Sequence, residues 1–480
     1  MKDLQDILRN VEIEMIIGGS KKHIADICFD SRKVQSNSLF VAQKGTEVDG
    51  HKFIEQSIAK GASVVVCEDL PQSLNPSVTY IKVVNSDIAL GIMASNYFDN
   101  PSEKLKLIGI TGTNGKTTTV TLLHNLFLSF GYKVGCLSTI VNKINEREVP
   151  STHTTPDAIE LNNLLAQMVD EGCLFVFMEV SSHSIVQNRI AGLQFFGGIF
   201  SNITHDHLDY HKTFDAYIDA KKAFFDMLPP TAFSLVNTDD KHGLVMQQNT
   251  AARRFTYALA KAADFHATII ENTFDGLLLN IDNVEVSTRL VGKFNAQNLL
   301  AIYATAVLCG IDKEKILIAM SLLESANGRF NTYTLKSGAK AIVDYAHTPD
   351  ALANVLSTIR DIVHKSVRVI TVVGCGGNRD KTKRPEMANI AQRESDILIL
   401  TSDNPRDESP EAIIDDMIAG LSTQDNVLTI ADRRSAIKTA CTMANKGDIV
   451  LVAGKGHETY QEINRVKLHF DDAEEIARFC

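Results

Sequence analysis

The chain has 480 residues, which is too long for one hydrophobic core and suggests about three domains at ~150 residues each. Hydrophobic residues make up 44% and charged residues 22%, as in ordinary globular proteins, and a formal net charge of -10 argues against a protein that coats nucleic acid or another polyanion. The sequence has neither a signal peptide nor an apolar run long enough to span a bilayer. Its eight cysteines are dispersed without Cys-x-x-Cys spacing, so we expect reduced thiols in a cytoplasmic protein.

Changes of pattern divide the chain into three predicted α/β domains. Residues 1–100 hold short apolar runs and end in a polar, proline-containing segment that is typical of a linker. Residues 101–330 open with an apolar strand and a helix. Residues 331–480 alternate strands with helical stretches, which predicts a parallel sheet covered on both faces. Such sheets bind ligands at the carboxyl ends of their strands, so the third domain is also expected to be functional.

A glycine-rich turn follows the predicted strand at 106–110 and leads into a predicted helix at 117–130. The turn and the first helical residues are Gly112, Thr113, Asn114, Gly115, Lys116, Thr117 and Thr118. A turn in this context binds nucleotide phosphates, because backbone N–H groups and the helix N-terminus attract anions. Lys116 is expected to reach the outer phosphates and the Thr117 hydroxyl to bind Mg²⁺. Ile110 stands where the standard phosphate-loop motif has its first glycine, so the loop is a variant.

This variant loop resembles the signature loop of the Mur ligases and of the related folylpolyglutamate synthetases. These enzymes use ATP to convert a carboxylate into an acyl phosphate, which an amine then attacks. The resemblance covers nearly the whole chain, from Asp30-Ser31-Arg32 to residues 453–461. It implies a uridine-binding α/β domain at 1–100, a P-loop ATPase-like domain with a parallel sheet at 101–330, and a Rossmann-like domain that binds an amino acid at 331–480. We expect a monomer.

Two further segments imply a pair of Mg²⁺ ions. Glu179 closes a predicted strand at 174–180, and a carboxylate there suits a divalent cation. The histidine-rich segment 204–211 suggests zinc at first sight, but neither a thiol nor an H-E-x-x-H helix accompanies it. It resembles the Mur ligase motif in which one histidine, here His207, binds the second Mg²⁺. Lys221 matches the lysine that carries a CO₂-derived carbamate in the family, with Lys222 as its competitor; a buried lysine loses its proton readily. The implied catalytic residues are Lys116, Glu179, His207 and Lys221, and the implied metal ligands are Thr117, Glu179, His207 and Lys221 as N6-carboxylysine.

Other matched segments imply contacts to ATP and to a UDP-linked substrate. The loop shares the implied ATP site with residues from 292–298, 328–330 and 344–349, although Asn295 in the first of these also suits a helix cap. The implied ATP contacts are Gly112, Thr113, Asn114, Gly115, Lys116, Thr117, Thr118, Asn298, Arg329, Asp344 and His347. The implied UDP-substrate contacts are Ser31, Thr46, Thr154, Thr155, Ser181, Gln187 and Arg189, and the planar guanidinium of the last suits a diphosphate.

The acceptor site is implied by Asp403-Asn404-Pro405-Arg406, which follows a predicted strand at 397–401. It matches the motif with which tripeptide-forming Mur ligases recognise meso-2,6-diaminopimelate. This amino acid differs from lysine by a carboxylate at its far end, which arginine can hold bidentately. Lysine would leave such arginines without a partner and would therefore bind poorly. The implied diaminopimelate contacts are Arg379, Asp403, Asn404, Pro405, Arg406, Gly454 and Glu458.

Together these matches imply a ligase that joins meso-2,6-diaminopimelate to UDP-N-acetylmuramoyl-L-alanyl-D-glutamate, at the γ-carboxylate of D-glutamate, in peptidoglycan synthesis. Two other enzymes remain open: a lysine-adding member of the same family, and a folylpolyglutamate synthetase, which would need neither the uridine domain nor residues 403–406. A nucleotide-dependent scaffold without catalysis is the third alternative. The presence of Lys116, Glu179, His207 and Lys221 together speaks against it.

Overall fold

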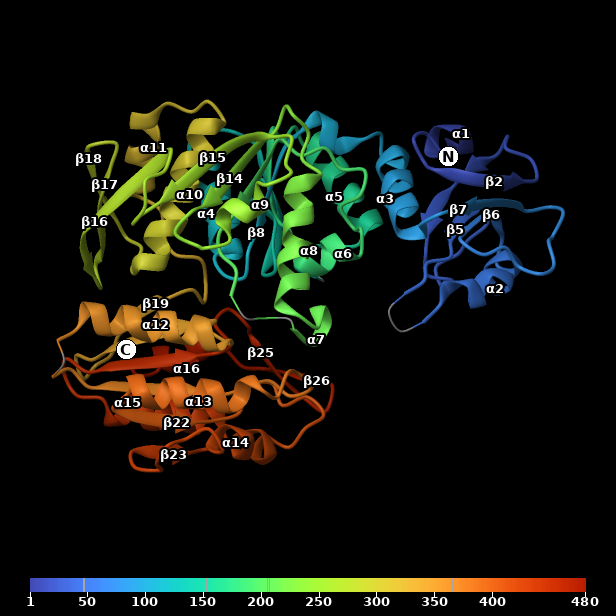
Figure 1. Ribbon diagram of the computed structural model, residues 1–480. Helices are drawn as coiled ribbons and strands as arrows, with labels where there is room; N and C mark the ends of the chain where they lie inside the picture. The colour runs from blue at the N-terminus through green and yellow to red at the C-terminus, as the bar shows by residue number, and fades with distance from the viewer. Residues whose placement is uncertain (46–47, 152, 205, 207, 365) are drawn as a thin grey trace.

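The computed structural model describes residues 1–45, 48–151, 153–204, 206, 208–364 and 366–480. Within these residues three large sheets follow one another along the chain, and two two-stranded ribbons accompany them. Each large sheet lies inside one of the three predicted domain segments, while the domain limits at residues 100 and 330 stay predictions. Figure 1 shows the N-terminal part beside the central part and the C-terminal part below it.

The N-terminal sheet has five strands in the order β2-β7-β6-β5-β4. Only β2 is antiparallel to its neighbour. Val64 and Val66 of β6 face one core cluster and Val65 faces the other, because successive side chains of a strand point to opposite sides of the sheet. Helix α3 packs against α5 of the central part. The elements are β1 (Lys2–Asp3), α1 (Leu4–Ile7), β2 (Ile13–Ile17), β3 (His23–Ile24), β4 (Asp26–Cys28), β5 (Ser38–Val41), η1 (Gly50–Phe53), α2 (Ile54–Ala59), β6 (Ala62–Cys67), β7 (Thr79–Val83), α3 (Ser86–Tyr97) and η2 (Pro101–Lys104).

The central sheet has eleven strands in the order β11-β10-β9-β12-β8-β13-β14-β15-β16-β17-β18. Its strands are β8 (Lys106–Thr111), β9 (Val134–Leu137), β10 (Val141–Ile144), β11 (Arg147–Pro150), β12 (Phe175–Glu179), β13 (Gly197–Phe200), β14 (Phe233–Asn237), β15 (Arg253–Ala258), β16 (Phe265–Thr273), β17 (Gly276–Ile281) and β18 (Val284–Thr288). Its helices are α4 (Lys116–Ser129), α5 (Ala158–Asp170), α6 (Ser182–Val186), α7 (Leu208–His211), α8 (Phe214–Asp226), α9 (Gly243–Met246), α10 (Lys293–Leu308) and α11 (Lys313–Met320).

The expectation of a parallel central sheet is right for its middle and wrong for both edges. Strand β10 pairs antiparallel with β9 and β11, and β17 pairs antiparallel with β16 and β18. The hairpins are possible because Asn145, Asp282 and Asn283 adopt left-handed backbone conformations, with φ values of 55°, 51° and 64°. Two-residue turns of this kind join antiparallel neighbours, whereas parallel neighbours need a long crossover.

Strand β8 lies in the middle of the central sheet and is buried on both faces. Ile108 and Ile110 pack in the core cluster that also contains residues of α4 and α10. Leu107 packs on the other face, in the cluster that contains residues of α5 and α8. The predicted strand and helix around the glycine-rich turn are therefore confirmed, and the turn is held at the carboxyl end of a strand that has no freedom to shift.

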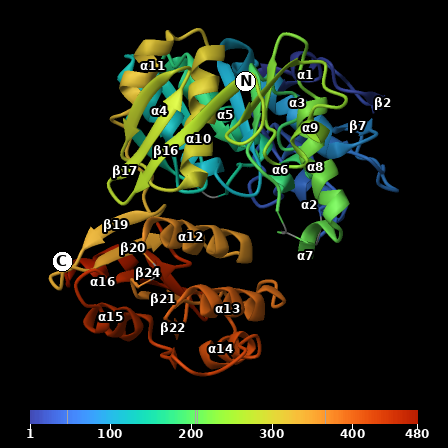
Figure 2. The same cartoon turned by 60° about the vertical axis from the view of Figure 1, so that its left-hand side comes forward.

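The C-terminal sheet has six strands in the order β19-β20-β24-β21-β22-β23, and only β19 is antiparallel. Helices α12, α13 and α14 cover one face, and α15 and α16 the other. Figure 2 shows α12 between this sheet and the central part. The elements are β19 (Asn331–Thr334), β20 (Lys340–Asp344), α12 (Pro349–Ile362), β21 (Val369–Val373), α13 (Lys383–Glu394), β22 (Ile397–Leu400), α14 (Pro410–Ile418), β23 (Val427–Thr429), α15 (Arg433–Met443), β24 (Ile449–Ala453), β25 (Tyr460–Ile463), β26 (Val466–His469) and α16 (Asp472–Ala477).

All eight cysteines lie among the described residues and none is in a disulfide; seven are buried and Cys480 is exposed. Across the described part of the chain, no helix combines the length and the apolar character that a membrane span requires.

Candidate active site

A cavity of about 1340 Å³ is lined by residues of the central and C-terminal parts. It brings together most of the residues that the sequence singled out. From the predicted ATP set it is lined by Thr113, Asn114, Gly115, Lys116, Thr117, Thr118, Arg329 and His347. From the predicted substrate and metal sets it is lined by Thr154, Thr155, Glu179, Ser181, Arg189 and Lys221. From the predicted acceptor set it is lined by Arg379, Asp403, Asn404, Arg406, Gly454 and Glu458.

The glycine-rich turn is shaped by a residue from a distant strand end. Asn202, which follows β13, accepts the Thr113 N–H at its carbonyl (2.8 Å) and the Asn114 N–H at its side-chain oxygen (2.9 Å). Gly115 has φ 87°, and a Cβ there would lie 2.6 Å from Oδ1 of Asn298. The predicted ATP contact Asn298 therefore packs directly behind the loop, which only a glycine at position 115 permits.

Two lysine ammonium groups meet at this loop. Lys116 donates to the carbonyl oxygens of Gly112 (2.8 Å) and Thr113 (2.9 Å), and Lys221 donates to the carbonyl of Gly112 (2.9 Å). Burial and the neighbouring Lys116 charge hold the pKa of Lys221 well below its ordinary value. Lys222 turns away and pairs with Asp226 at 2.7 Å. The two adjacent lysines thus differ in environment, and Lys221 is the one that lies buried beside the phosphate loop with a lowered pKa.

The carboxylate of Glu179 ends β12 at the wall of the same cavity. Its side-chain oxygens accept hydrogen bonds from the backbone N–H (2.8 Å) and the hydroxyl (3.1 Å) of Thr139. The hydroxyl oxygens of Thr139 and Thr154 lie 3.1 Å apart, and the Thr155 hydroxyl donates to the Glu179 carbonyl (2.8 Å). These contacts fix the predicted metal ligand against the predicted substrate pair Thr154 and Thr155.

Arg189 lies on the substrate side of Glu179 and is oriented by neutral oxygens. Its guanidinium donates to the carbonyl of Thr155 (2.8 Å) and to Oε1 of Gln187 (2.9 and 2.6 Å). Gln187 in turn donates to the hydroxyl of Tyr210 (3.2 Å). Neither hydrogen-bond partner of the guanidinium carries a charge, and Asp157 is the carboxylate whose charge acts on it.

The connection between the central and C-terminal parts carries Arg329. Its Nη2 donates to the Thr117 hydroxyl (3.3 Å), and its guanidinium lies 4.6 Å from the ring centroid of Tyr345. Asp344, at the end of β20, accepts the backbone N–H groups of Phe330 and Ala346, both at 2.8 Å. Burial raises the pKa of Asp344 to about 6. Arg329 therefore links the phosphate loop to the first turn of the C-terminal part.

The predicted acceptor residues converge at the carboxyl ends of β22 and β24. Asn404 donates to Glu458 (2.7 Å), and the fully buried ammonium of Lys455 donates to both Asn404 and Glu458 at 3.2 Å. Asp403 lies 3.9 Å from the same ammonium. Partial burial and the Asp403 carboxylate raise the pKa of Glu458. Two carboxylates therefore share one buried ammonium at this point of the cavity.

Arginines border this pocket on its other side. Arg406 has φ 53°, and its Nη1 donates to the carbonyl of Gly377 (2.8 Å). Its backbone N–H donates to the carbonyl of Glu462 (3.0 Å) in β25, so the ribbon formed by β25 and β26 anchors it. Arg379 is exposed and lies in the turn after β21. Pro405 closes this turn, since its carbonyl would lie 1.9 Å from a Cβ on Gly377.

Two buried arginines support the pocket and were not predicted. Arg433 pairs with Asp472 at 2.7 Å, both side chains are fully buried, and the guanidinium also donates to the carbonyls of Ala453 (3.0 Å) and Ser402 (3.4 Å). Arg384 pairs with Glu408 at 2.9 Å and donates to the Gly376 carbonyl (3.2 Å). In the sequence, each of the two is only an arginine in a predicted helical stretch, and an arginine in such a stretch is usually exposed to solvent.

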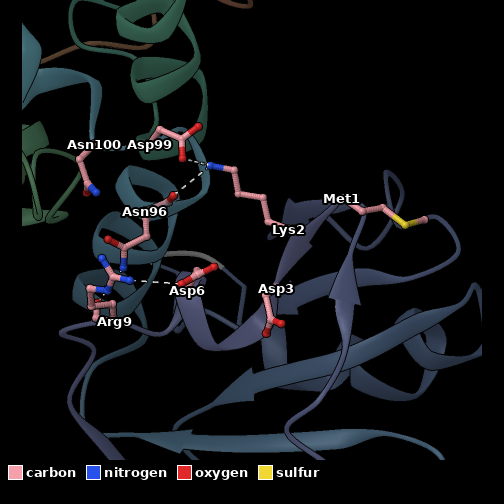
Figure 3. Close-up of a pocket in the computed structure, with 8 residues that line it drawn as sticks. All are labelled: Met1, Lys2, Asp3, Asp6, Arg9, Asn96, Asp99 and Asn100. Atoms are coloured by element: carbon pink, nitrogen blue, oxygen red, sulfur yellow. Dashed lines mark hydrogen bonds and ion pairs between the residues drawn. The ribbon is translucent and has the colours of Figure 1, made fainter.

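Among the described residues of the predicted sets, Ser31 lies away from this assembly. Ser31 is in the N-terminal part, where its hydroxyl donates to Gln56 (3.4 Å), and Thr46 and His207 lie outside the described residues. The N-terminal part also has a pocket of about 430 Å³, shown in Figure 3. Its side chains pair with one another, as in the Lys2–Asp99 contact, and it contains none of the predicted site residues.

A glycine-rich loop at the end of a central parallel strand faces a second α/β unit across one cavity, and the Glu179 carboxylate and the buried Lys221 side chain stand beside the loop. This fold and site are those of an α/β enzyme whose cavity lies between a glycine-rich loop and a second α/β unit. Comparison with known proteins identifies the family. Three family profiles match: the Mur ligase family, catalytic domain, at residues 23–98; the Mur ligase middle domain at 110–306; and the Mur ligase, glutamate ligase domain, at 328–456.

The chain belongs to the Mur ligase family. A relative from Cytophaga hutchinsonii is 57% identical over 98% of this chain and 97% of its own length, and one from Phocaeicola vulgatus is 54% identical over 98% of each. Both are named UDP-N-acetylmuramoyl-L-alanyl-D-glutamate--2,6-diaminopimelate ligase. A solved structure of a protein with the same name superimposes with a TM-score of 0.70 at 33% identity, covering 99% of this chain and 98% of that one. Folylpolyglutamate synthases share the fold at 14% to 16% identity.

Proposed function

We propose that this chain is an ATP-dependent ligase that joins meso-2,6-diaminopimelate to the γ-carboxylate of D-glutamate in UDP-N-acetylmuramoyl-L-alanyl-D-glutamate, a step of peptidoglycan synthesis. The observation that carries the proposal is the single cavity that contains both the phosphate loop and the amine-binding pocket. Relatives that match this chain over almost their whole length carry the corresponding enzyme name.

The reaction has two steps with a shared intermediate. The γ-phosphoryl group of ATP passes to the substrate carboxylate, which gives an acyl phosphate and ADP. The amine of diaminopimelate then attacks the acyl carbon, the amide bond forms, and phosphate leaves. Lys116 and the backbone N–H groups at the start of α4 stabilise the charge on the phosphoryl oxygens, and Arg189 binds the diphosphate of the UDP substrate.

Two Mg²⁺ ions fit the donor groups on the phosphate side of the cavity. The Thr117 hydroxyl and the Glu179 carboxylate are hard oxygen ligands. Lys221 would add a third once its amine carries a CO₂-derived carbamate, and burial, which lowers the pKa of the amine, favours the unprotonated form which that reaction requires. His207 completes the proposed set from its place in the sequence. When bound, the ions offset the negative charges of the phosphoryl group and of the carboxylate.

The acceptor pocket favours diaminopimelate over lysine on grounds of charge. Asp403 and Glu458 accept from the far ammonium, which both amino acids possess. Arg379 and Arg406 are positioned to bind the far carboxylate, which lysine lacks. Lysine would therefore leave Arg379 and Arg406 without a far carboxylate to bind, although Arg406 keeps its ion pair with Glu462 at 3.5 Å.

The test is ADP release from ATP and UDP-N-acetylmuramoyl-L-alanyl-D-glutamate with either diaminopimelate or lysine as acceptor. We expect turnover with diaminopimelate, and a selective loss of it in Arg406→Met. Arg465→Met is the matched control, because Arg465 lies in the turn of the β25–β26 ribbon and its side chain is 83% exposed. Turnover with lysine and none with diaminopimelate would refute diaminopimelate as the acceptor. Turnover with a folate, without any binding of a uridine nucleotide, would instead favour a folylpolyglutamate synthetase.

A further inference from the structure

Two loops contact each other through their backbones. One adjoins the proposed nucleotide site and the other the proposed acceptor site. Gly328 precedes Arg329 in the connection to the C-terminal part, and Gly456 lies in the loop between β24 and β25. A Cβ on Gly328 would lie 2.0 Å from the backbone nitrogen of His457, and a Cβ on Gly456 would lie 2.6 Å from the carbonyl oxygen of Gly328. The φ angles are 69° and 53°. Side chains at either position would force the loops apart, so the contact needs two glycines.

Next to this contact, the side chains of Arg329, Tyr345 and His457 pack in a row between the same two loops. The guanidinium of Arg329 lies 4.6 Å from the ring centroid of Tyr345, and the Tyr345 ring lies 4.7 Å from the imidazole of His457. His457 directly precedes Glu458, the proposed ligand of the acceptor ammonium. The guanidinium of Arg329, which lies over Tyr345, also donates to the hydroxyl of Thr117 in the phosphate loop (3.3 Å). Packed groups therefore connect the acceptor pocket to the phosphate loop without a break.

We infer that Tyr345 and His457 are positioning residues that couple binding of the acceptor amino acid to binding of the nucleotide through Arg329. The identity of the acceptor rests on the proposed function. A ligand on Glu458 restrains the loop that carries His457, and the glycine contact and the Tyr345 ring extend that restraint to Arg329. The nucleotide then binds beside a guanidinium whose contact with Thr117 is restrained further, so less conformational entropy is lost and the two ligands bind with positive cooperativity.

The coupling is measured by calorimetric titration of ADP into the full chain with Mg²⁺, first alone and then with saturating diaminopimelate. We expect ADP to bind at least about fivefold more tightly in the presence of diaminopimelate, which is the lower end of typical coupling between sites. Diaminopimelate must then gain the same factor in the presence of ADP, because coupling between binding equilibria is reciprocal.

Variants separate this role from a merely structural one. Tyr345→Leu removes the ring and is expected to abolish the coupling, while each ligand still binds by itself. Tyr345→Phe keeps the ring and is expected to keep the coupling. Gly456→Ala separates the loops and is expected to abolish it too. Gly447→Ala is its matched control, because Gly447 also has a positive φ (90°) but a Cβ there would meet no atom within 4 Å.

The outcomes distinguish failure of the inferred coupling from failure of the proposed function. If the parent chain binds both ligands without coupling, or if Tyr345→Leu retains the coupling, the inference is wrong and the proposed function stands. If the parent chain binds ADP and not diaminopimelate, the proposed acceptor is wrong and the inference falls with it. Thermal unfolding of each variant shows whether a loss of binding reflects a loss of the fold.

Discussion

Substitution of Gly454 tests the proposed acceptor pocket, because the Asp403 carboxylate occupies the space where a side chain at position 454 would lie. It follows β24 with φ 116°, and a Cβ there would lie 2.6 Å from Oδ2 of Asp403. In Gly454→Ala the carboxylate must move. A hydrogen bond to a charged group contributes about 1.5–3 kcal/mol. Losing it lowers kcat/KM for diaminopimelate by about 10- to 150-fold, at 1.4 kcal/mol for each factor of ten.

The assay is ADP release at saturating ATP and UDP substrate with diaminopimelate varied. At saturating ATP the expected change lies in the dependence on diaminopimelate, since Gly454 contacts Asp403 on the acceptor side of the cavity. Alanine in a left-handed conformation also costs about 1–2 kcal/mol of stability. Gly447→Ala, in open space at φ 90°, controls for that cost. A folded Gly454→Ala enzyme with the parent's kcat/KM for diaminopimelate would refute the assignment of Asp403 to the acceptor.

Three further predictions concern buried charges. Lys221→Ala removes the proposed anionic metal ligand and is expected to lower turnover by about 100-fold or more in the same ADP-release assay, as loss of one group that stabilises the transition state does; full activity would exclude the assignment. Arg433→Met leaves the fully buried Asp472 without its partner and is expected to lose about 3–5 kcal/mol in urea denaturation, most of which a second change, Asp472→Leu, restores. For Asp344, the pKa of about 6 lies above its ordinary 3.8, so its contribution to stability is present below pH 3.8 and lost as the pH rises through 6. Its size is about 3 kcal/mol at 1.36 kcal/mol per pKa unit, and the stability of the parent relative to Asp344→Asn should fall by that amount over this range.

Short-range sequence patterns predicted the elements that depend on neighbouring residues in the chain. The strand before the phosphate loop and the helix after it follow from hydrophobic runs and turn residues, and β8 and α4 occupy those positions within one residue. The same patterns could not choose between Lys221 and Lys222. That choice depends on which side of α8 meets the carbonyl of Gly112, more than 100 residues earlier in the chain.

Long-range contacts account for what the sequence did not reveal. Asn202 shapes the phosphate loop only because β13 lies next to β8 in the sheet. The pair Arg433–Asp472 joins two helices that are separated by β24 and the β25–β26 ribbon. A charged residue in a helix is usually exposed, so nothing in the local sequence marks these two as fully buried. Residues 403–406 were recognised only through the family, since a polar turn by itself carries no acceptor chemistry.

The arrangement of thiols gives the natural chain a built-in attachment point for a spectroscopic label. Burial raises the pKa of Cys136 and Cys375 to about 12, and the other buried cysteines are shielded in the same way. Because the thiolate is the reactive form, a maleimide dye added near neutral pH should reach Cys480 first. That residue lies beside α16, on the C-terminal part of the molecule. Fluorescence from one unmutated position can therefore report changes around α16 as nucleotide and amino acid are added.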